Sequence, residues 1–176
     1  MADLAFNTTA GETMARELLL LCLNTGTANS PTWSPCGKRT TDSSMEIDWN
    51  EETNTDVLGV TRTSLKNPQR SQTFDPVPLD SGDSATVKIW NLAFHDQDPH
   101  ALAAQDFLLV HLYATSSSST FAERFPSSAV IPTGLGGEGG GDLGMPYKVV
   151  FGGERVTGTA SRDSTTGAIT FTPDSN

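Results

Sequence analysis

Long apolar runs are missing from this 176-residue sequence. The longest, Leu18–Leu23, has six residues, whereas a helix that spans a bilayer needs roughly 20. The segment before it carries Glu12 and Glu17 and no small-residue cleavage pattern, so it does not read as a secretory signal. We therefore expect no membrane association and a chain that is cytoplasmic when it is synthesised.

Cysteine is also scarce. Cys22 and Cys36 are too few for a disulfide scaffold, and they lack the spacing of a zinc site. If the segments around them form a hairpin with a symmetric loop, the two side chains would face each other and could form a disulfide. A reducing cytoplasm favours two free, mostly buried thiols instead.

Basic residues are few, with 11 lysines and arginines against 21 acids, for a net charge of −10. A protein that coats nucleic acid needs cationic side chains to release counterions from phosphates, so this class is excluded. Two interpretations of the acidity stay open. It serves solubility, or it belongs to a surface that must not adhere to a polyanion.

Catalytic and metal-binding patterns are absent from the sequence. His95 and His100 are five residues apart with Pro99 between them, which is not the spacing of a two-histidine metal helix. Asp106 and His111 would lie on opposite faces of a strand, so they cannot act as triad partners. There is no Gly-x-Ser-x-Gly elbow around any serine. We expect no enzyme, no metal and no cofactor.

Glycine is concentrated in one place, where seven of the eleven residues from 134 to 144 are glycine. A phosphate-binding loop would need a lysine followed by serine or threonine, and this segment has Glu138 and Asp142 instead. Two interpretations stay open for the expected loop, about residues 133–146. It is a mobile surface loop, or it becomes ordered against a neighbouring subunit.

Strand patterns dominate the first half of the chain. Ala15–Leu23 has the length of a buried strand, although Met14–Leu21 could begin as a helix, and a turn-rich segment separates it from a short strand at Trp33. Met45–Trp49 alternates apolar and polar residues and predicts a strand with one acidic face. Residues 51–56 are expected to form a polar loop. Two further strands, 60–66 and 70–74, are predicted to pair as a hairpin around residues 67–69.

A helix is predicted to begin near Asp80, capped by that residue or by Ser81. Val87, Trp90 and Phe94 recur at helical spacing and predict its buried stripe, which Ile89 and Leu92 widen. The pair at 98–99, Asp-Pro, predicts the start of a second short helix, over 100–105. All three tryptophans, at 33, 49 and 90, are expected in the core, which disfavours a carbohydrate-binding cleft lined by exposed aromatic residues.

The second half returns to strands. Phe107–Tyr113 is an almost unbroken apolar run and predicts a central strand buried on both faces. The four serines at 116–119 predict a loop. Segments 147–151 and 155–161 are predicted to pair through a turn at Gly152-Gly153, and 163–167 turns into a last strand at 168–172. The order predicts a single domain, all-β to α+β, in which a β-sandwich or partial barrel is flanked by one main helix.

Several stretches, in this order, resemble the major tail (tail-tube) proteins of long-tailed bacteriophages with non-contractile tails, over roughly residues 15–172. They are 32–40 (TWSPCGKRT), 45–50 (MEIDWN), 56–59 (DVLG), 70–76 (RSQTFDP), 90–93 (WNLA), 105–113 (QDFLLVHLY), 121–126 (FAERFP) and 153–159 (GERVTGT).

The resemblance implies a virion structural subunit that assembles in the host cytoplasm. Six subunits would close into a ring by continuing their sheets into one inner β-barrel, which leaves no exposed edges. Rings would stack around the tape-measure protein, meet tail terminator and tail-tip proteins at their ends, and later conduct the genome without specific binding. An N-terminal arm, about residues 1–14, and long loops would tie subunits together. The sequence ends at Asn176 and leaves no room for the C-terminal immunoglobulin-like domain of many members.

Two groups of residues follow as candidate functional residues. Glu46 and Asp48 are predicted to face the lumen, where acidic side chains would repel DNA phosphates. The predicted inter-subunit loops contain Glu51, Glu52, Asp56, Leu135, Gly136, Gly137, Glu138, Gly139, Gly140, Gly141, Asp142 and Leu143. Other virion subunits (head decoration, baseplate or adhesion) and a carbohydrate-binding sandwich are the competing functions.

Overall fold

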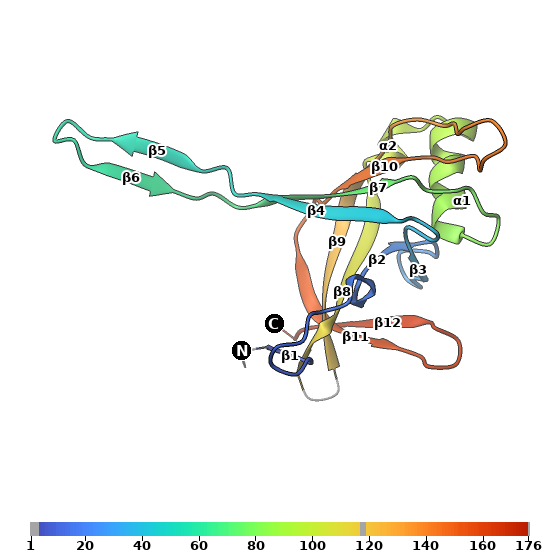
Figure 1. The fold of residues 1–176 in the computed structure, drawn as a ribbon, viewed down its shortest axis with the longest axis horizontal. Coiled ribbons are helices and arrows are strands. Elements are labelled where there is room, and N and C mark those ends of the chain that lie inside the picture. Colours follow the sequence, from blue (N-terminus) through green and yellow to red (C-terminus); the bar gives the residue numbers. More distant parts are fainter. Residues whose placement is uncertain (1–3, 117–118, 176) are drawn as a thin grey trace.

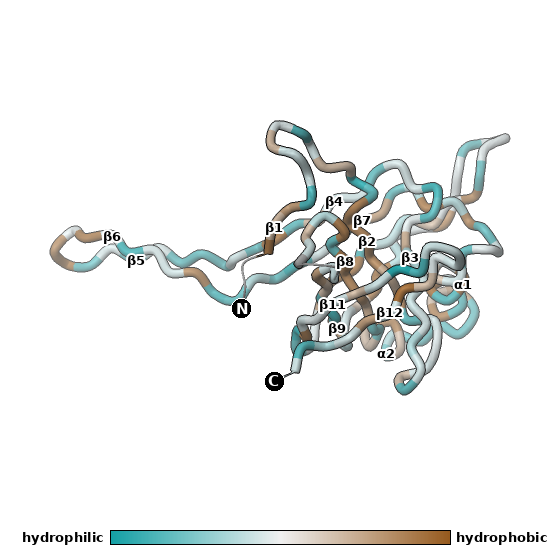
Figure 2. The backbone as a smooth tube through the Cα atoms, turned by 90° about the horizontal axis from the view of Figure 1, so that it is seen from below, coloured by the Kyte–Doolittle hydropathy of each residue, from teal (hydrophilic) through white to brown (hydrophobic). Residues whose placement is uncertain are grey.

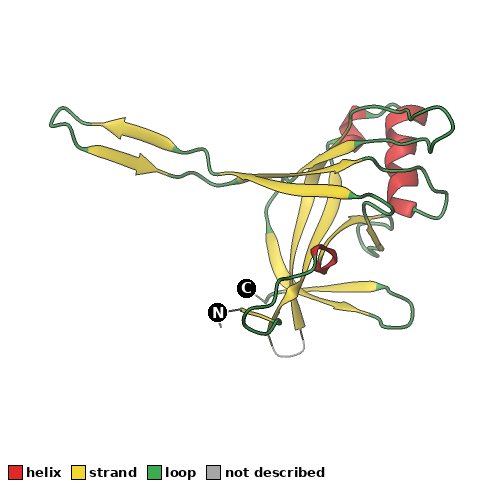
Figure 3. Ribbon diagram, viewed as in Figure 1, coloured by secondary structure: helices red, strands yellow, loops and turns green. Residues whose placement is uncertain are grey.

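The fold is one long curled sheet, a partial barrel, with a helix on its concave side and a two-stranded arm that projects from the body (Figure 1, Figure 3). The computed structural model describes residues 4–116 and 119–175. The strands are β1 (Ala5–Phe6), β2 (Leu19–Asn24), β3 (Trp33–Pro35), β4 (Asp42–Asp48), β5 (Glu52–Thr55), β6 (Thr61–Ser64), β7 (Gln69–Asp75), β8 (Gln105–Ser116), β9 (Ser119–Pro132), β10 (Tyr147–Val150), β11 (Val156–Arg162) and β12 (Ile169–Pro173). The helical elements are η1 (Arg16–Leu18), α1 (Ser84–Trp90), its π-helical continuation η2 (Asn91–His95) and α2 (Pro99–Leu102).

The main sheet has the order β3-β2-β8-β9-β10-β7-β4, and neighbouring strands are antiparallel. β9 joins the two halves of the sheet. Its first part pairs with β8 and β11, and residues 129–132 pair with β10. This change of partner along one 14-residue strand lets the sheet curl into a half-barrel. The expected partial barrel flanked by one main helix is confirmed.

β8 is buried on both faces, as its apolar run predicts. Phe107 and Leu109 belong to the larger core, which also contains Ile89 of α1 and Tyr147 of β10. Leu108 and its neighbours on the other face of the strand belong to a second, smaller core covered by β3 and the β11–β12 hairpin. Together the two cores place β8 at the centre of the molecule.

The hairpin predicted around residues 67–69 is wrong. β6 pairs with β5, and the two strands form the projecting arm with its turn at residues 56–60. β7 pairs with β4 and β10 instead. The expected polar loop at 51–56 is therefore mostly strand β5. The local turn signal at Pro68 was real, but it marks where the chain leaves the arm and enters the sheet.

The hairpin predicted at Gly152-Gly153 is also wrong, because β10 and β11 both pair with β9 and not with each other. The two glycines allow the chain to pass close over the bend of β9. A Cβ atom on Gly152 would lie 2.4 Å from the carbonyl oxygen of Ser127, and Gly153 has φ +77°. Both glycines therefore serve a close backbone approach.

The cap of the main helix is Asp83, which lies three residues after Asp80, the first of the two predicted caps. The buried side chain of Asp83, not Asp80 or Ser81, accepts hydrogen bonds from the N–H (3.2 Å) and hydroxyl (2.7 Å) of Thr86. The predicted stripe is correct at Ile89, which is fully buried, and at Trp90, which packs against the core, but Val87 and Phe94 are 40% and 36% exposed. The buried face of α1 consists of Ala85, Thr86 and Ile89.

Several local predictions are confirmed. β2 and β3 form a hairpin, and Cys22 and Cys36 are free thiols in this part of the fold. Burial raises the pKa of the Cys22 thiol to about 12. Asp98 caps α2 with Pro99 at its first position, although the helix ends at Leu102.

Other local predictions lie partly outside the described residues or are wrong. β1 ties part of the expected N-terminal arm to β8 through Ala5 and Phe6. The first three residues of that arm, and residues 117–118 of the predicted serine loop, lie outside the described residues. Trp49 is 48% exposed at the base of the β5–β6 arm, so its expected place in the core is wrong, because β4 runs beyond the core at that end.

Candidate assembly surfaces

The outer face of β4 and β7 is acidic. Glu46 and Asp48 point away from the core side of β4, and Asp42 shares their face. Asp42 stands opposite Asp75 of β7. None of the ion pairs within the described residues involves these four carboxylates. Asp42 and Asp75 therefore add two carboxylates, unpaired among the described residues, to the surface that carries the predicted lumen residues Glu46 and Asp48.

The other edge of β4 has no strand beside it among the described residues. In an antiparallel pair, alternate residues direct both backbone groups away from the partner. Ser43 is such a residue, since its carbonyl oxygen accepts a hydrogen bond from Arg16 Nε (3.1 Å) and not from β7. By the same alternation the backbone groups of Met45 and Ile47 face outward along an exposed edge.

Arg16 links this edge to the other half of the sheet. Its Nη1 donates to the carbonyl oxygen of Leu19 (2.8 Å) at the start of β2, while its Nε donates to Ser43. One guanidinium group therefore bridges β2 and β4 across the open side of the half-barrel.

The arm distributes the predicted inter-subunit acids along its length instead of grouping them. Glu52 pairs with Lys66 (3.1 Å), and Asp56 at the tip pairs with Arg62 (2.7 Å). Glu51, just before β5, is exposed. Threonine pairs join the two strands, as in Thr53 and Thr63 (3.1 Å). These contacts support a hairpin that has no core of its own.

The glycine-rich segment forms a loop that is closed at its base. Gly136 and Gly144 exchange two backbone hydrogen bonds (3.0 and 2.7 Å), and Leu79 donates to the carbonyl oxygen of Leu143 (2.8 Å). The predicted residues beyond this closure, from Gly137 through Glu138, Gly139, Gly140 and Gly141 to Asp142, are exposed. Leu135 and Leu143 are 43% and 51% exposed. The loop therefore presents apolar side chains at its base and a polar tip.

A buried carboxylate holds the two halves of the sheet together. Glu123 of β9 is 2% exposed and accepts from Arg70 of β7 (2.9 and 3.0 Å), from His111 of β8 (2.8 Å) and from Arg155. Burial alone would raise the pKa of Glu123, but the hydrogen bond from His111 and the charges of Arg70 and Arg155 outweigh it and lower the pKa to about 2. Sequence reasoning missed this cluster, although a lone acid in an apolar strand was a signal.

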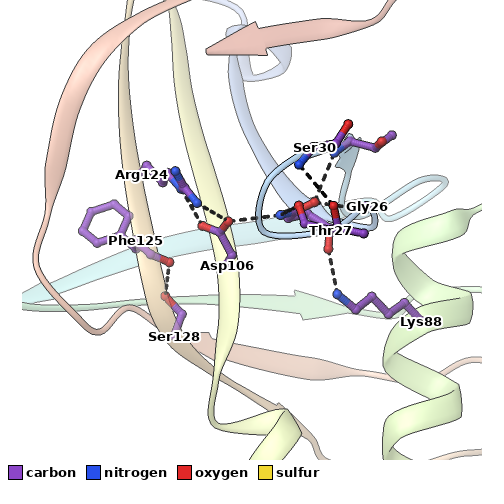
Figure 4. A network of polar contacts seen from close by, with 10 residues as sticks. Gly26, Thr27, Ser30, Lys88, Asp106, Arg124, Phe125 and Ser128 are labelled. Carbon is purple, nitrogen blue, oxygen red and sulfur yellow. Dashed lines mark hydrogen bonds and ion pairs between the residues drawn. The ribbon is translucent and has the colours of Figure 1, made fainter. Parts of the chain in front are cut away.

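A second polar network positions α1 (Figure 4). Asp106 of β8 accepts two hydrogen bonds from Arg124 of β9 (both 2.9 Å) and one from Asn24 (3.1 Å). Lys88 reaches from α1 to the carbonyl oxygen of Asn24 (2.7 Å). The network thus ties the helix to the β2–β3 turn and to the central strands.

The cavities of the described residues do not converge on a catalytic group. One cavity, of about 420 Å³, is lined by Arg70, Arg155, Phe125 and Phe151 beside the Glu123 cluster, where the charged groups are already paired. A search of the described residues finds no group of three or more His, Cys, Asp and Glu side chains arranged to hold a metal ion. None of the described helices is long and apolar enough to cross a membrane.

Comparison with known proteins identifies the fold through structure and not through sequence. No family model and no curated protein matches the chain. Two solved structures match with a TM-score of 0.50. One, at 9% identity over 85% of this chain and 99% of that chain, is the sheath/tube terminator of an extracellular contractile injection system (PVC) in its extended state. The other, at 12% identity over 91% of this chain and 100% of that chain, is the tube-terminating cap of the anti-feeding prophage.

The first of these structures belongs to a contractile injection system, whereas the sequence resemblance named non-contractile tails. At such low identity the likeness shows a shared fold. The chain has the fold of tail-tube terminator and cap proteins.

Proposed function

We propose that this chain is a non-catalytic structural subunit of a phage-like tail tube and acts by assembling with copies of itself into rings. The observation that carries the proposal is the four-stranded segment β9-β10-β7-β4, which has an unpaired edge at β4 and an acidic outer face. The shared fold with tube terminator and cap proteins supports the same function.

Ring closure would pair the two ends of this segment. At one end, β4 offers the outward backbone groups of Met45 and Ile47. At the other, residues 129–132 of β9 pair with β10 on one side, and no described strand lies on their second side. A neighbour's β4 can pair with this second edge, and repetition in a ring, for which six subunits are expected, would leave no edge exposed.

The acidic face would then line the lumen. Asp42, Glu46, Asp48 and Asp75 share it, and Lys148 of β10 stands nearby opposite Thr73. A lumen of this sign repels DNA phosphates and lets the genome pass without binding. The remaining partners follow from this role: a tape-measure protein in the lumen, terminator and tail-tip proteins at the ends of the tube, and a location in the virion tail.

A terminator that caps a tube with a single ring is the second candidate, because one of the compared structures is a terminator and the other is a cap. A tube subunit stacks rings on both faces, whereas a terminator stacks on one. The purified protein distinguishes the two: a tube subunit would form stacks of increasing length as its concentration rises, and a terminator would stop at one ring.

The edge-pairing proposal is tested with Ile47→Pro. Ile47 is 48% exposed, and its backbone faces the open edge, so proline removes an outward N–H and leaves the pairing with β7 intact. We expect a folded monomer that does not form rings in sedimentation velocity experiments. The control Ile47→Ala removes the same apolar side chain but keeps the N–H and should assemble. Ring formation by the proline variant would refute closure through β4.

A further inference from the structure

The tip of the β5–β6 arm is apolar and fully exposed. Val57 and Leu58 are 101% and 85% exposed, and the apolar colour of the tip contrasts with the polar arm behind it (Figure 2). Neither side chain contacts the core, so a tip that faced only solvent would gain nothing from these residues. Large apolar side chains grouped in this way mark a contact surface.

The tip is also held in one shape. Asp56 Oδ1 accepts hydrogen bonds from the N–H groups of Leu58 (2.9 Å) and Val60 (3.0 Å), and the N–H of Gly59 donates to the carbonyl oxygen of Asp56 (2.9 Å). Gly59 has φ +77°, which closes the turn. The tip is thus preorganised, which lowers the entropy that it would lose on binding.

A depression that fits such a tip lies beside α1. Leu79, Val87 and Trp90 form its apolar walls, with Thr86 and residues 80–81 completing it, and it encloses about 190 Å³. An apolar cavity of about 150 Å³ holds a benzene-sized group, so this one has room for a leucine side chain. Val87, which faces it, is exposed although the helix pattern predicted burial.

One molecule cannot bring the two features together. The arm and α1 lie at opposite ends of the molecule in two perpendicular views (Figure 1, Figure 2). The arm is a hydrogen-bonded hairpin that points away from the body. A tip that fills the depression would therefore belong to another copy of the chain, and each copy carries a tip of matching size and chemistry.

We propose that the tip of one copy, Val57-Leu58, inserts into the depression formed by Leu79, Val87 and Trp90 of a neighbouring copy. The contact joins two different surfaces, so it is repeated from copy to copy in one direction and can close a ring or link rings. It rests on the proposed self-assembly, to which it adds a specific pair of surfaces. It also gives the predicted contact region around Asp56 a physical role, because Asp56 fixes the shape of the tip.

Cysteine cross-linking between two differently labelled copies tests the contact. We expect Leu58→Cys on one copy to form a disulfide with Val87→Cys on the other when assembly is followed by mild oxidation. Thr165→Cys, in the exposed β11–β12 turn, replaces Val87→Cys as the control and should give less than one tenth of the product. Equal cross-linking at both positions, or none at Val87, would overturn the proposal. Leu58→Cys mixed with wild-type protein controls for Cys22 and Cys36.

Assembly of a tip variant separates this proposal from the proposed function. Val57→Ser combined with Leu58→Ser should raise the protein concentration needed for assembly at least tenfold, while Asn54→Ser on the arm should not change it. If the serine variant assembles like the wild type, the docking proposal fails and the function stands. If wild-type protein stays monomeric at every concentration, the proposed function fails.

Discussion

Glu123 shows how one residue can hold this fold together. Its partners come from β7, from β8 and from the residue just before β11, which are far apart in the sequence. Since a buried carboxylate is costly without counter-charges, the segments that carry Arg70, His111 and Arg155 must be correctly placed around Glu123 for it to remain ionised. The cluster therefore couples the two halves of the curled sheet.

Replacing Glu123 with glutamine should lower the free energy of unfolding at pH 7 by about 3 kcal/mol, because it removes the buried carboxylate that pairs with Arg70 and Arg155. The pKa of Glu123 is about 2 in the folded protein against an ordinary value of 4.5. A lowered pKa stabilises the fold above the unfolded value, and this contribution is lost as pH falls from about 4.5 to 2. Chemical denaturation at several pH values should show the difference between wild type and variant shrinking over this range.

Glu12→Gln is the matched control, since Glu12 is an exposed acid. It should unfold like the wild type within about 0.5 kcal/mol. A Glu123→Gln variant with the same small effect, or one whose difference from wild type stays constant with pH, would show that the cluster does not stabilise the fold.

At the residue scale, sequence patterns predicted one of the two helix caps, Asp98, and missed Asp83 and the Glu123 cluster. Asp98 caps its helix as expected because the signal lies within three residues. The Glu123 cluster could not be assembled from the sequence, because no local spacing links positions 70, 111, 123 and 155. The predicted burial of Trp49 is wrong for a related reason. The alternation of apolar and polar residues shows that the two faces of a strand differ, but not where along the strand the core ends.

At the scale of elements, the strands were largely predictable and their partners were not. The central strand β8 was evident from its unbroken apolar run. Two of the predicted hairpins failed because β7, β10 and β11 pair with strands distant in the sequence. A glycine pair or a proline marks a change of direction, but it does not say which strand lies beside the next one.

The glycine-rich loop is the element whose behaviour in the assembly is most open to measurement. We expect the amides of residues 137–142 to exchange quickly with solvent in the monomer, except that of Gly141, which donates to the carbonyl oxygen of Glu138 (3.0 Å). In assemblies they should become protected, because the loop orders against a neighbour. The Gly144 amide, bonded to Gly136 at 2.7 Å, should be protected in both states. Equal exchange of 137–142 in both states would exclude a contact through this loop.

At the scale of the whole molecule, the proposed function assigns some surfaces to contact with other copies and one surface to repulsion of DNA. In the proposed assembly the edge of β4 and the arm tip contact neighbouring copies, whereas the acidic face of β4 and β7 repels DNA phosphates. Reversing the charge of both predicted lumen residues, with Glu46→Lys and Asp48→Lys, should leave assembly intact and slow the release of DNA from particles that carry the variant. The control reverses Glu12 and Glu17 on the N-terminal segment. Normal DNA release by the lumen variant would remove these residues from the lumen.

The proposed function depends most on self-assembly into hollow rings. Negative-stain electron microscopy of the purified wild-type protein over a rising concentration series, with mass measured in parallel, tests this directly. We predict hollow rings or tubes above a threshold concentration, with a mass that is a multiple of 18.7 kDa. A compact monomer at every concentration would contradict the proposed self-assembly.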